Sequence, residues 1–390
     1  MRGRTGWVWA ISTITRASVL LPSVAGANLA LQRPHLGRLA LTGLAWLLFV
    51  SGVASFVTDA ALLARSTRGN PAVEGYRALT ALCAASGAVV ALAVSASWLS
   101  VCLLSAGGSL VPRVAGARSA AIRAGRVARP YASGMLRDAA LAAGWLLATR
   151  DHLDDGVAEA MVATSLGLGC VLPLLPLRTY MHRQGVRPTL GARSAVLMAG
   201  FGLHSFLPTG ARVAIAHGMS AIQLASFEMS ERVNYLVVSG LLGGLGSELQ
   251  RRWSLDRSRL NARREVVALG AVLALVGVIG GAVVGVIGHS ALSDVSHQIT
   301  RLEWLTLSLA MGFVAGCGGL LTVLVRWEMA NSRGDAVGRR LLGATPIAAL
   351  GLLIASRYDS AVFVASALAL YLLVVTALTI RAFQHASNSS

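Results

Sequence analysis

Long apolar runs of about twenty residues dominate this sequence, and short arginine-bearing segments separate them. A bilayer core about 30 Å thick is crossed by about 20 apolar residues in an α-helix, because backbone polar groups in lipid must be satisfied within the segment. Such runs cover residues 7–30, 39–63, 78–96, 98–113, 131–149, 156–177, 195–216, 219–249, 266–287, 304–325, 341–357 and 360–380. The sequence therefore predicts an all-α, polytopic membrane protein with about twelve transmembrane helices.

The placement of the arginines supports this number of spans, since short cytoplasmic loops carry an excess of basic residues. With the amino terminus inside, 25 of the 34 arginines fall in cytoplasmic segments, six in outer loops and three within spans. The net charge of +17 is then a sign of membrane topology and does not indicate a nucleic-acid partner. We expect a multi-pass protein of the inner (cytoplasmic) membrane with both termini in the cytoplasm. The arginine-rich segments 113–129 and 249–264 are expected to lie along anionic lipids of the inner leaflet.

A weak internal repeat predicts that the helices form two halves. The stretch "LLPSVAGANLALQ" from Leu20 aligns with "FLPTGARVAIAHG" from Phe206, an offset of 186 residues. Many transporters are built from duplicated halves of this kind. We therefore predict one six-helix bundle over residues 1–180, a cytoplasmic linker over 181–194, and a second six-helix bundle over 195–390.

Several charged residues lie inside the predicted spans, where a charge costs roughly 2.5 to 3.5 kcal/mol and usually faces protein or water. Arg16, His204, Glu231 and Arg232 fall near the middle of their spans. Glu228 precedes Arg232 by four residues, which is the favourable order for an ion pair within one helix. Two interpretations stay open: the pair neutralises itself and fixes the packing, or it forms part of a cavity.

Other features of the spans favour packing or the membrane interface. Asp59 lies near the cytoplasmic end of its span, where it can meet Arg65 or lipid headgroups. Arg137 and Asp138 lie in the first turns of the fifth span, and Arg212 lies near the outer rim, where a long side chain can reach the interface. Small residues at four-residue spacing predict close helix contacts, at Gly277, Gly281 and Gly285, at Gly240 and Gly244, and at Gly312 and Gly316.

The second span and the turn before it carry a family resemblance. The stretch "LQRPHLGRLALTGLAWLLFVSGVASFVTDAALLARS" covers residues 31–66. It resembles the start of polysaccharide and oligosaccharide-lipid flippases of the multidrug/oligosaccharidyl-lipid/polysaccharide (MOP) exporter superfamily, and it keeps Pro34, Gly37, Asp59 and Arg65 of their pattern. It departs from that pattern at Arg33, His35, Leu36 and Ala61. Residues 218–254, near the start of the predicted second half, also look like the start of the second half in this family.

The resemblance implies two six-helix bundles around a central cavity that opens alternately to each side of the membrane. It implies export of a lipid-linked saccharide, with envelope-glycan synthesis proteins as partners. Basic groups near the middle of the membrane would attract its anionic head, and the acidic residues would shape or discharge the site. The candidate substrate-binding residues are Arg16, His204, Glu228, Glu231 and Arg232, and the candidates for coupling or gating are Asp59 and Arg137.

Other functions stay open at this stage. A proton-coupled drug or metabolite exporter would use Glu228, Glu231 or Asp59 to carry protons. An envelope-synthesis enzyme or a membrane scaffold is a third class. The sequence has no Walker A motif, no GxSxG motif and no pair of metal ligands at helical spacing, so we expect no enzymatic activity, no cofactor and no metal site.

Overall fold

A computed structural model describes residues 14–15, 17–65, 74–123, 126, 128–181, 192–255, 259–291, 299–330, 334–358 and 360–388. In this part of the chain the regular structure is helical throughout. The α-helices are α2 (Leu20–Gln32), α3 (Pro34–Arg65), α4 (Glu74–Ala93), α5 (Trp98–Arg123), α6 (Ala128–Ala148), α7 (Asp155–Val171), α8 (Arg178–Met181), α9 (Ala192–Gly218), α10 (Ala221–Leu255), α11 (Arg259–Ala291), α13 (Arg301–Ala330), α14 (Gly334–Ala355) and α15 (Ala361–Asn388). A short 3-10 turn, η1 (Leu172–Leu174), follows α7.

Each of the twelve predicted spans falls on a different helix, and the first span is described mainly through α2, which begins at Leu20. Among the described residues, seven helices are long and apolar enough to cross a membrane by length and composition alone. They are α3, α5, α7, α11, α13, α14 and α15. The prediction of an all-α, multi-pass membrane protein with about twelve long helices is therefore confirmed.

One span extends further than the sequence suggested. The predicted fourth span ends at residue 113, but α5 continues to Arg123 through Pro112. Its last turns are not a separate surface segment, since Ala117 and Ala121 are fully buried with Leu177 and Tyr180 in one apolar cluster. Apolar burial against neighbouring helices holds these turns to the bundle.

The helices form two compact units. Unit 2 consists of residues 17–195 and 208–225, and unit 1 contains residues 196–207 and 226–390 together with the first sixteen residues. The first six long helices lie in unit 2, the last four lie in unit 1, and α9 and α10 contribute to both. The predicted boundaries at residues 180 and 195 stay a prediction, as does the cytoplasmic linker 181–194, most of which lies outside the described residues.

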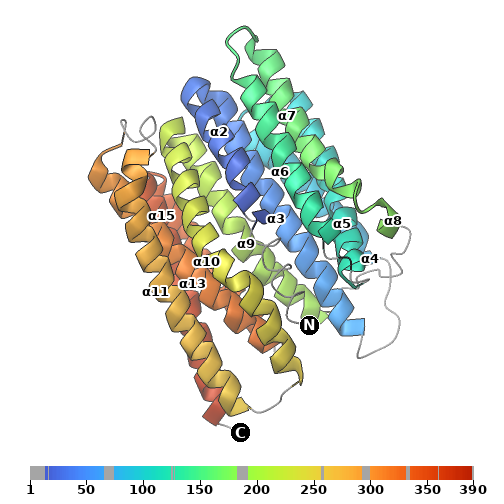
Figure 1. Ribbon diagram of the computed structural model, residues 1–390, viewed down its shortest axis with the longest axis vertical. Coiled ribbons are helices and arrows are strands. Elements are labelled where there is room, and N and C mark those ends of the chain that lie inside the picture. Colours follow the sequence, from blue (N-terminus) through green and yellow to red (C-terminus); the bar gives the residue numbers. More distant parts are fainter. Residues whose placement is uncertain are drawn as a thin grey trace. The chain divides into compact units, whose positions relative to one another are not determined.

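In unit 2 the helices run side by side (Figure 1), with α5 packed against α3, α4 and α7, and α2 packed against α3 and α6. Loops that the arginine pattern assigned to the same side do meet. Arg33, which follows α2, contacts Asp155 at 3.1 Å and donates to the Leu153 carbonyl at 2.7 Å. Arg129 donates to Thr179 Oγ1 at 3.0 Å at the other end of the bundle. The prediction that successive loops lie at opposite ends of the helices is thus confirmed in unit 2. Which of the two ends faces the cytoplasm stays a prediction.

In unit 1 the helix α13 packs against α11, α14 and α15. The contact with α11 depends on glycine. A Cβ atom on Gly277 would lie 2.5 Å from the Gly312 carbonyl oxygen, and one on Gly281 would lie 2.6 Å from the Ser308 carbonyl oxygen. The predicted close contacts between these two helices are therefore confirmed, whereas Gly240 and Gly244 lie where no side-chain contacts are described.

Candidate functional site

A buried ion pair lies on α10 in unit 1. Glu228 is 0% exposed, and its Oε1 accepts a hydrogen bond of 2.6 Å from Arg232 Nε. The two residues are one helical turn apart, so their side chains lie on the same face. The predicted pair within one helix is confirmed. It removes most of the net charge that two separate ionised groups would bring into an apolar bundle.

Polar side chains continue along the same helix toward α13. The amide nitrogen of Asn234 donates to the Ser230 carbonyl at 2.8 Å and to the Ser308 carbonyl at 3.3 Å, and Ser230 Oγ lies 3.5 Å from Ser308 Oγ. All three side chains are buried. Asn234 Oδ1 has no hydrogen-bond partner among the described residues. The interior of unit 1 therefore contains a row of buried polar side chains. It is formed by α10 and α13 together, so the sequence of either helix alone does not predict it.

His204 on α9 is held by a residue from the last helix. Its Nδ1 lies 3.1 Å from the hydroxyl of Tyr371 on α15, and the two rings are 5.8 Å apart between centroids. The Tyr371 side chain is fully buried, and His204 is half-buried. A hydrogen bond of this kind fixes the orientation of the imidazole ring.

A second buried carboxylate lies in unit 2. Asp138 on α6 is 0% exposed, and its Oδ1 contacts Arg137 Nε and Nη2, each at 2.7 Å. Its Oδ2 accepts a hydrogen bond of 2.6 Å from Ser18, which lies just before α2. Both carboxylate oxygens are therefore satisfied. The sequence placed Arg137 and Asp138 in the same turns but did not indicate Ser18, which is 120 residues away along the chain.

Arg212 on α9 differs from its prediction. The sequence suggested that its side chain reaches the outer interface, but Arg212 is 0% exposed. Its Nη1 donates to the Pro208 carbonyl at 2.8 Å. The guanidinium group thus bonds to its own helix. A hydrogen bond to a protein carbonyl compensates for the bonds to water that a buried guanidinium loses.

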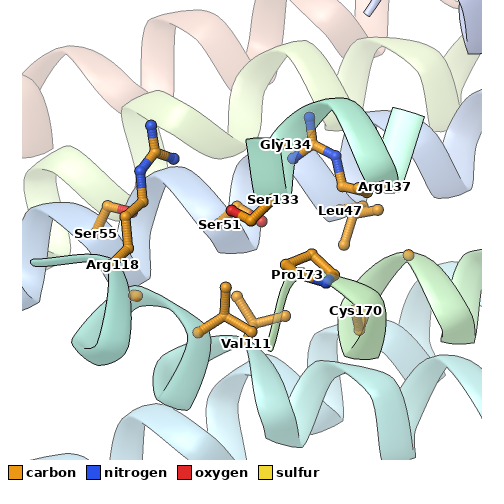
Figure 2. Close-up of a pocket in the computed structure, with 13 residues that line it drawn as sticks. Leu47, Ser51, Ser55, Val111, Arg118, Ser133, Gly134, Arg137, Cys170 and Pro173 are labelled. Atoms are coloured by element: carbon orange, nitrogen blue, oxygen red, sulfur yellow. The ribbon is translucent and has the colours of Figure 1, made fainter. Parts of the chain in front are cut away.

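A cleft in unit 2 opens between α3, α5, α6 and the end of α7. It contains about 450 Å³ of empty space, part of which is open to solvent. Figure 2 shows Arg118 and Ser55 toward one end, Arg137 toward the other, and Ser51 and Ser133 between them. The remaining lining is mainly apolar and comes from Leu47, Val111, Val114, Ala115, Gly134, Gly169, Cys170 and Pro173.

The predicted site residues are not all in view. Arg16 lies outside the described residues, and Asp59 lies on α3 in a stretch whose side chains are not described. Glu231 is half-buried, next to the Glu228–Arg232 pair in sequence. Among the seven candidates, the structure thus brings Glu228 and Arg232 into direct contact. Their role in binding stays a prediction, as do the roles of the other five.

The sequence pattern did not predict the environment of three polar residues. Ser18 and Arg118 became visible only through their neighbours in space, and Arg212 was expected to reach the surface. A lone serine or arginine in a helix has no spacing that marks it, since its partners come from other helices. Among the described residues, no group of three or more His, Cys, Asp or Glu side chains could hold a metal ion.

Two solved structures are similar to this chain over nearly its whole length. One is a crystal structure of a mutant of the Vibrio cholerae MATE transporter VcmN, with a TM-score of 0.54 and 13% identity, covering 99% of this chain and 96% of that one. The other is an inward-facing multidrug resistance MATE family transporter of the MOP superfamily, with a TM-score of 0.56 and 13% identity, covering 98% and 94%.

No protein-family model matches the sequence, and no curated protein matches it. The likeness to the two transporters is therefore one of fold, and it covers nearly the whole chain. The superfamily named for the second structure is the one that residues 31–66 resemble. The chain has the fold of MATE transporters of the MOP superfamily.

Proposed function

We propose that this protein is an exporter that moves an anionic, lipid-linked saccharide precursor outward across the cytoplasmic membrane by alternating access. The fold supports export, because it is shared over nearly the full chain with two transporters. The anionic character of the substrate has separate support, which comes from the charges inside the bundles.

The observation that carries the proposal is the pairing of the buried carboxylates. Among the described residues, Asp138 and Glu228 are the fully buried acids, and each contacts an arginine within 2.7 Å. A carboxylate that recognises a cationic drug must offer its charge to the drug, and these two are already neutralised. Arg212 is buried as well, and Arg118 lines the cleft. Arginines therefore accompany both buried carboxylates, and the guanidinium groups of the interior are of the kind that recognises a phosphate-bearing head.

Within this proposal, Arg232 and His204 attract the pyrophosphate or sugar-acid head together with Arg16. Glu228 holds the Arg232 guanidinium in one orientation, and Glu231 shapes the edge of the site. An arginine held at a fixed angle loses less freedom on binding a phosphate than a mobile one does. Asp59 and Arg137 remain the candidates for coupling or gating.

The test is transport of a labelled polyprenyl-pyrophosphate saccharide between the leaflets of liposomes that contain the purified protein. We expect movement with the wild-type chain and at least about a tenfold lower rate with Arg232→Gln combined with Glu228→Gln, since the double change removes one phosphate-binding charge without leaving a buried ion unpaired. Arg357→Gln is the matched control, because Arg357 is exposed in the same unit. Unchanged transport in the double variant would remove the pair from the substrate site.

A drug exporter is the second candidate, and the observation in its favour is that one of the similar structures is a multidrug resistance transporter. The same liposomes can be loaded with a cationic dye and given a proton gradient. Extrusion of the dye that Glu231→Gln abolishes, without movement of the saccharide lipid, would favour this second function.

A further inference from the structure

Three exposed arginines lie at one end of the helices of unit 2. Arg126 is in the connection between α5 and α6, Arg129 is in the first turn of α6, and Arg178 begins α8. Arg129 joins the two segments, because its Nη1 donates to Thr179 Oγ1 at 3.0 Å and its guanidinium carbon lies 5.6 Å from the centre of the Tyr180 ring. The Arg129 side chain is therefore held against α8.

Apolar packing fixes the backbone at this end of the unit. Ala117 and Ala121, in the last turns of α5, are buried in one cluster with Leu177 and Tyr180, so α8 packs against the end of α5 (Figure 1). The backbone N–H of Arg126 donates to the Ala121 carbonyl at 2.9 Å, which ties the connection to the same helix end. The contact of α5 with α8 therefore sets where the three arginines lie.

The charge of these arginines is not balanced by acids. None of the three side chains makes an ion pair with another residue of the described chain. The sequence has no Asp or Glu between residues 75 and 137, and none between residues 160 and 227. A guanidinium group has five N–H donors in one plane, and Arg129 uses one for Thr179. Arginines with free donors, in segments without acids, match an anion that offers several oxygen acceptors.

The depth of the arginines indicates where such an anion comes from. The predicted apolar spans nearest to them cover residues 131–149 and 156–177. Arg129 precedes the first of these spans by two residues, and Arg178 directly follows the second. Both therefore lie at the edge of the apolar segments, which is the depth at which lipid headgroups begin. The arginine pattern assigns this end to the cytoplasm, where the membrane leaflet is anionic.

We propose that Arg126, Arg129 and Arg178 form a binding site for the phosphate of one anionic phospholipid in the cytoplasmic leaflet. Arg129 is the fixed member, since Thr179 and Tyr180 hold its guanidinium group, and the other two add positive charge. The site is more specific than the general attraction of an arginine-rich segment, because it needs α8, 50 residues further along the chain. It lies within unit 2 and does not depend on what the protein exports.

The experiment measures lipid binding to the purified full-length chain in neutral detergent. One arm titrates short-chain phosphatidylglycerol, a second titrates phosphatidylcholine of the same chain length, and a third titrates glycerol 3-phosphate as a soluble phosphate. The shift in the thermal midpoint of unfolding reports binding in each arm. The test variants are Arg129→Gln and Arg178→Gln. The matched control is Arg150→Gln, which removes the same charge from an exposed position beyond the other end of α6.

We expect saturable stabilisation by phosphatidylglycerol. Its dissociation constant should rise about fivefold in each test variant, the factor that one arginine near an anionic surface contributes, and stay unchanged in Arg150→Gln. Either test variant is sufficient if the other does not fold. Equal saturation by phosphatidylcholine, saturation by glycerol 3-phosphate, or an equal loss in Arg129→Gln and Arg150→Gln would overturn the proposal. Saccharide transport is measured separately, so a failure of this site is distinguishable from a failure of the proposed export.

Discussion

The two buried carboxylates of this protein are held in different ways. In unit 1, Glu228 is paired with Arg232 on the same helix, one turn away. In unit 2, Asp138 contacts the adjacent Arg137 and also receives a hydrogen bond from Ser18, which lies just before another helix. The first pair can form as soon as α10 is helical, whereas the second cluster also links α6 to the region of α2. The Asp138 cluster should therefore contribute more to tertiary stability than the Glu228 pair.

The largest effect is expected from Asp138→Ala. The change leaves the Arg137 cation and the Ser18 hydroxyl without their acceptor, and we expect the free energy of unfolding to fall by about 3 to 5 kcal/mol. Denaturation of the detergent-solubilised protein measures this loss. Asp151→Ala is the control, because Asp151 is exposed in the loop between α6 and α7. Equal losses in both variants would show that the cluster adds no stability.

A smaller effect is expected from Arg232→Gln. Glu228 then loses a charge-assisted hydrogen bond at a position that is 0% exposed, which should cost about 1.5 to 3 kcal/mol. The loss is limited because an isolated buried carboxyl can take up a proton and become neutral. The same denaturation experiment applies, with Arg357→Gln as the exposed control. A loss larger than that of Asp138→Ala would reverse the expected order of the two regions.

Ser18→Ala tests the link between helices alone. The variant removes the 2.6 Å hydrogen bond to Asp138 but keeps the ion pair with Arg137, and we expect a loss of about 1 kcal/mol in unfolding free energy. Ser356→Ala serves as control, since that exposed hydroxyl, just after α14, donates to the Leu353 carbonyl of the same segment. If Ser18→Ala has no effect, the stabilising contact is the Arg137 pair by itself.

The smallest effect on stability is expected when both members of the α10 pair are replaced together. Glu228→Gln with Arg232→Gln leaves no unpaired ion, so the unfolding free energy should stay within about 1 kcal/mol of the wild-type value. This variant therefore separates packing from function. Retained stability with lost transport would support a cavity role, and a loss of folding would show that the pair is needed for packing.

The sequence predicted the main architecture because its physical cause is local. Apolar length decides whether a segment can cross the bilayer, and each of the twelve windows falls on a separate helix of the described chain. The pairing of Glu228 with Arg232 was also predictable, since a spacing of four residues places both on one helix face. The spacing of Gly277 and Gly281 predicted that α11 makes a close helix contact. It did not predict that the contacting helix is α13.

The tertiary structure alone decided which polar groups meet across helices. Ser18 and Asp138 are 120 residues apart, Arg212 turned out to be buried, and the cleft combines side chains from α3, α5, α6 and α7. Nothing in the spacing of these residues predicts their contacts, because the rotation and depth of each helix depend on how its neighbours pack. The sequence itself thus determined the apolar helices, the opposite directions of successive helices and the ion pair on α10. The surroundings of each buried charge depended on packing between helices.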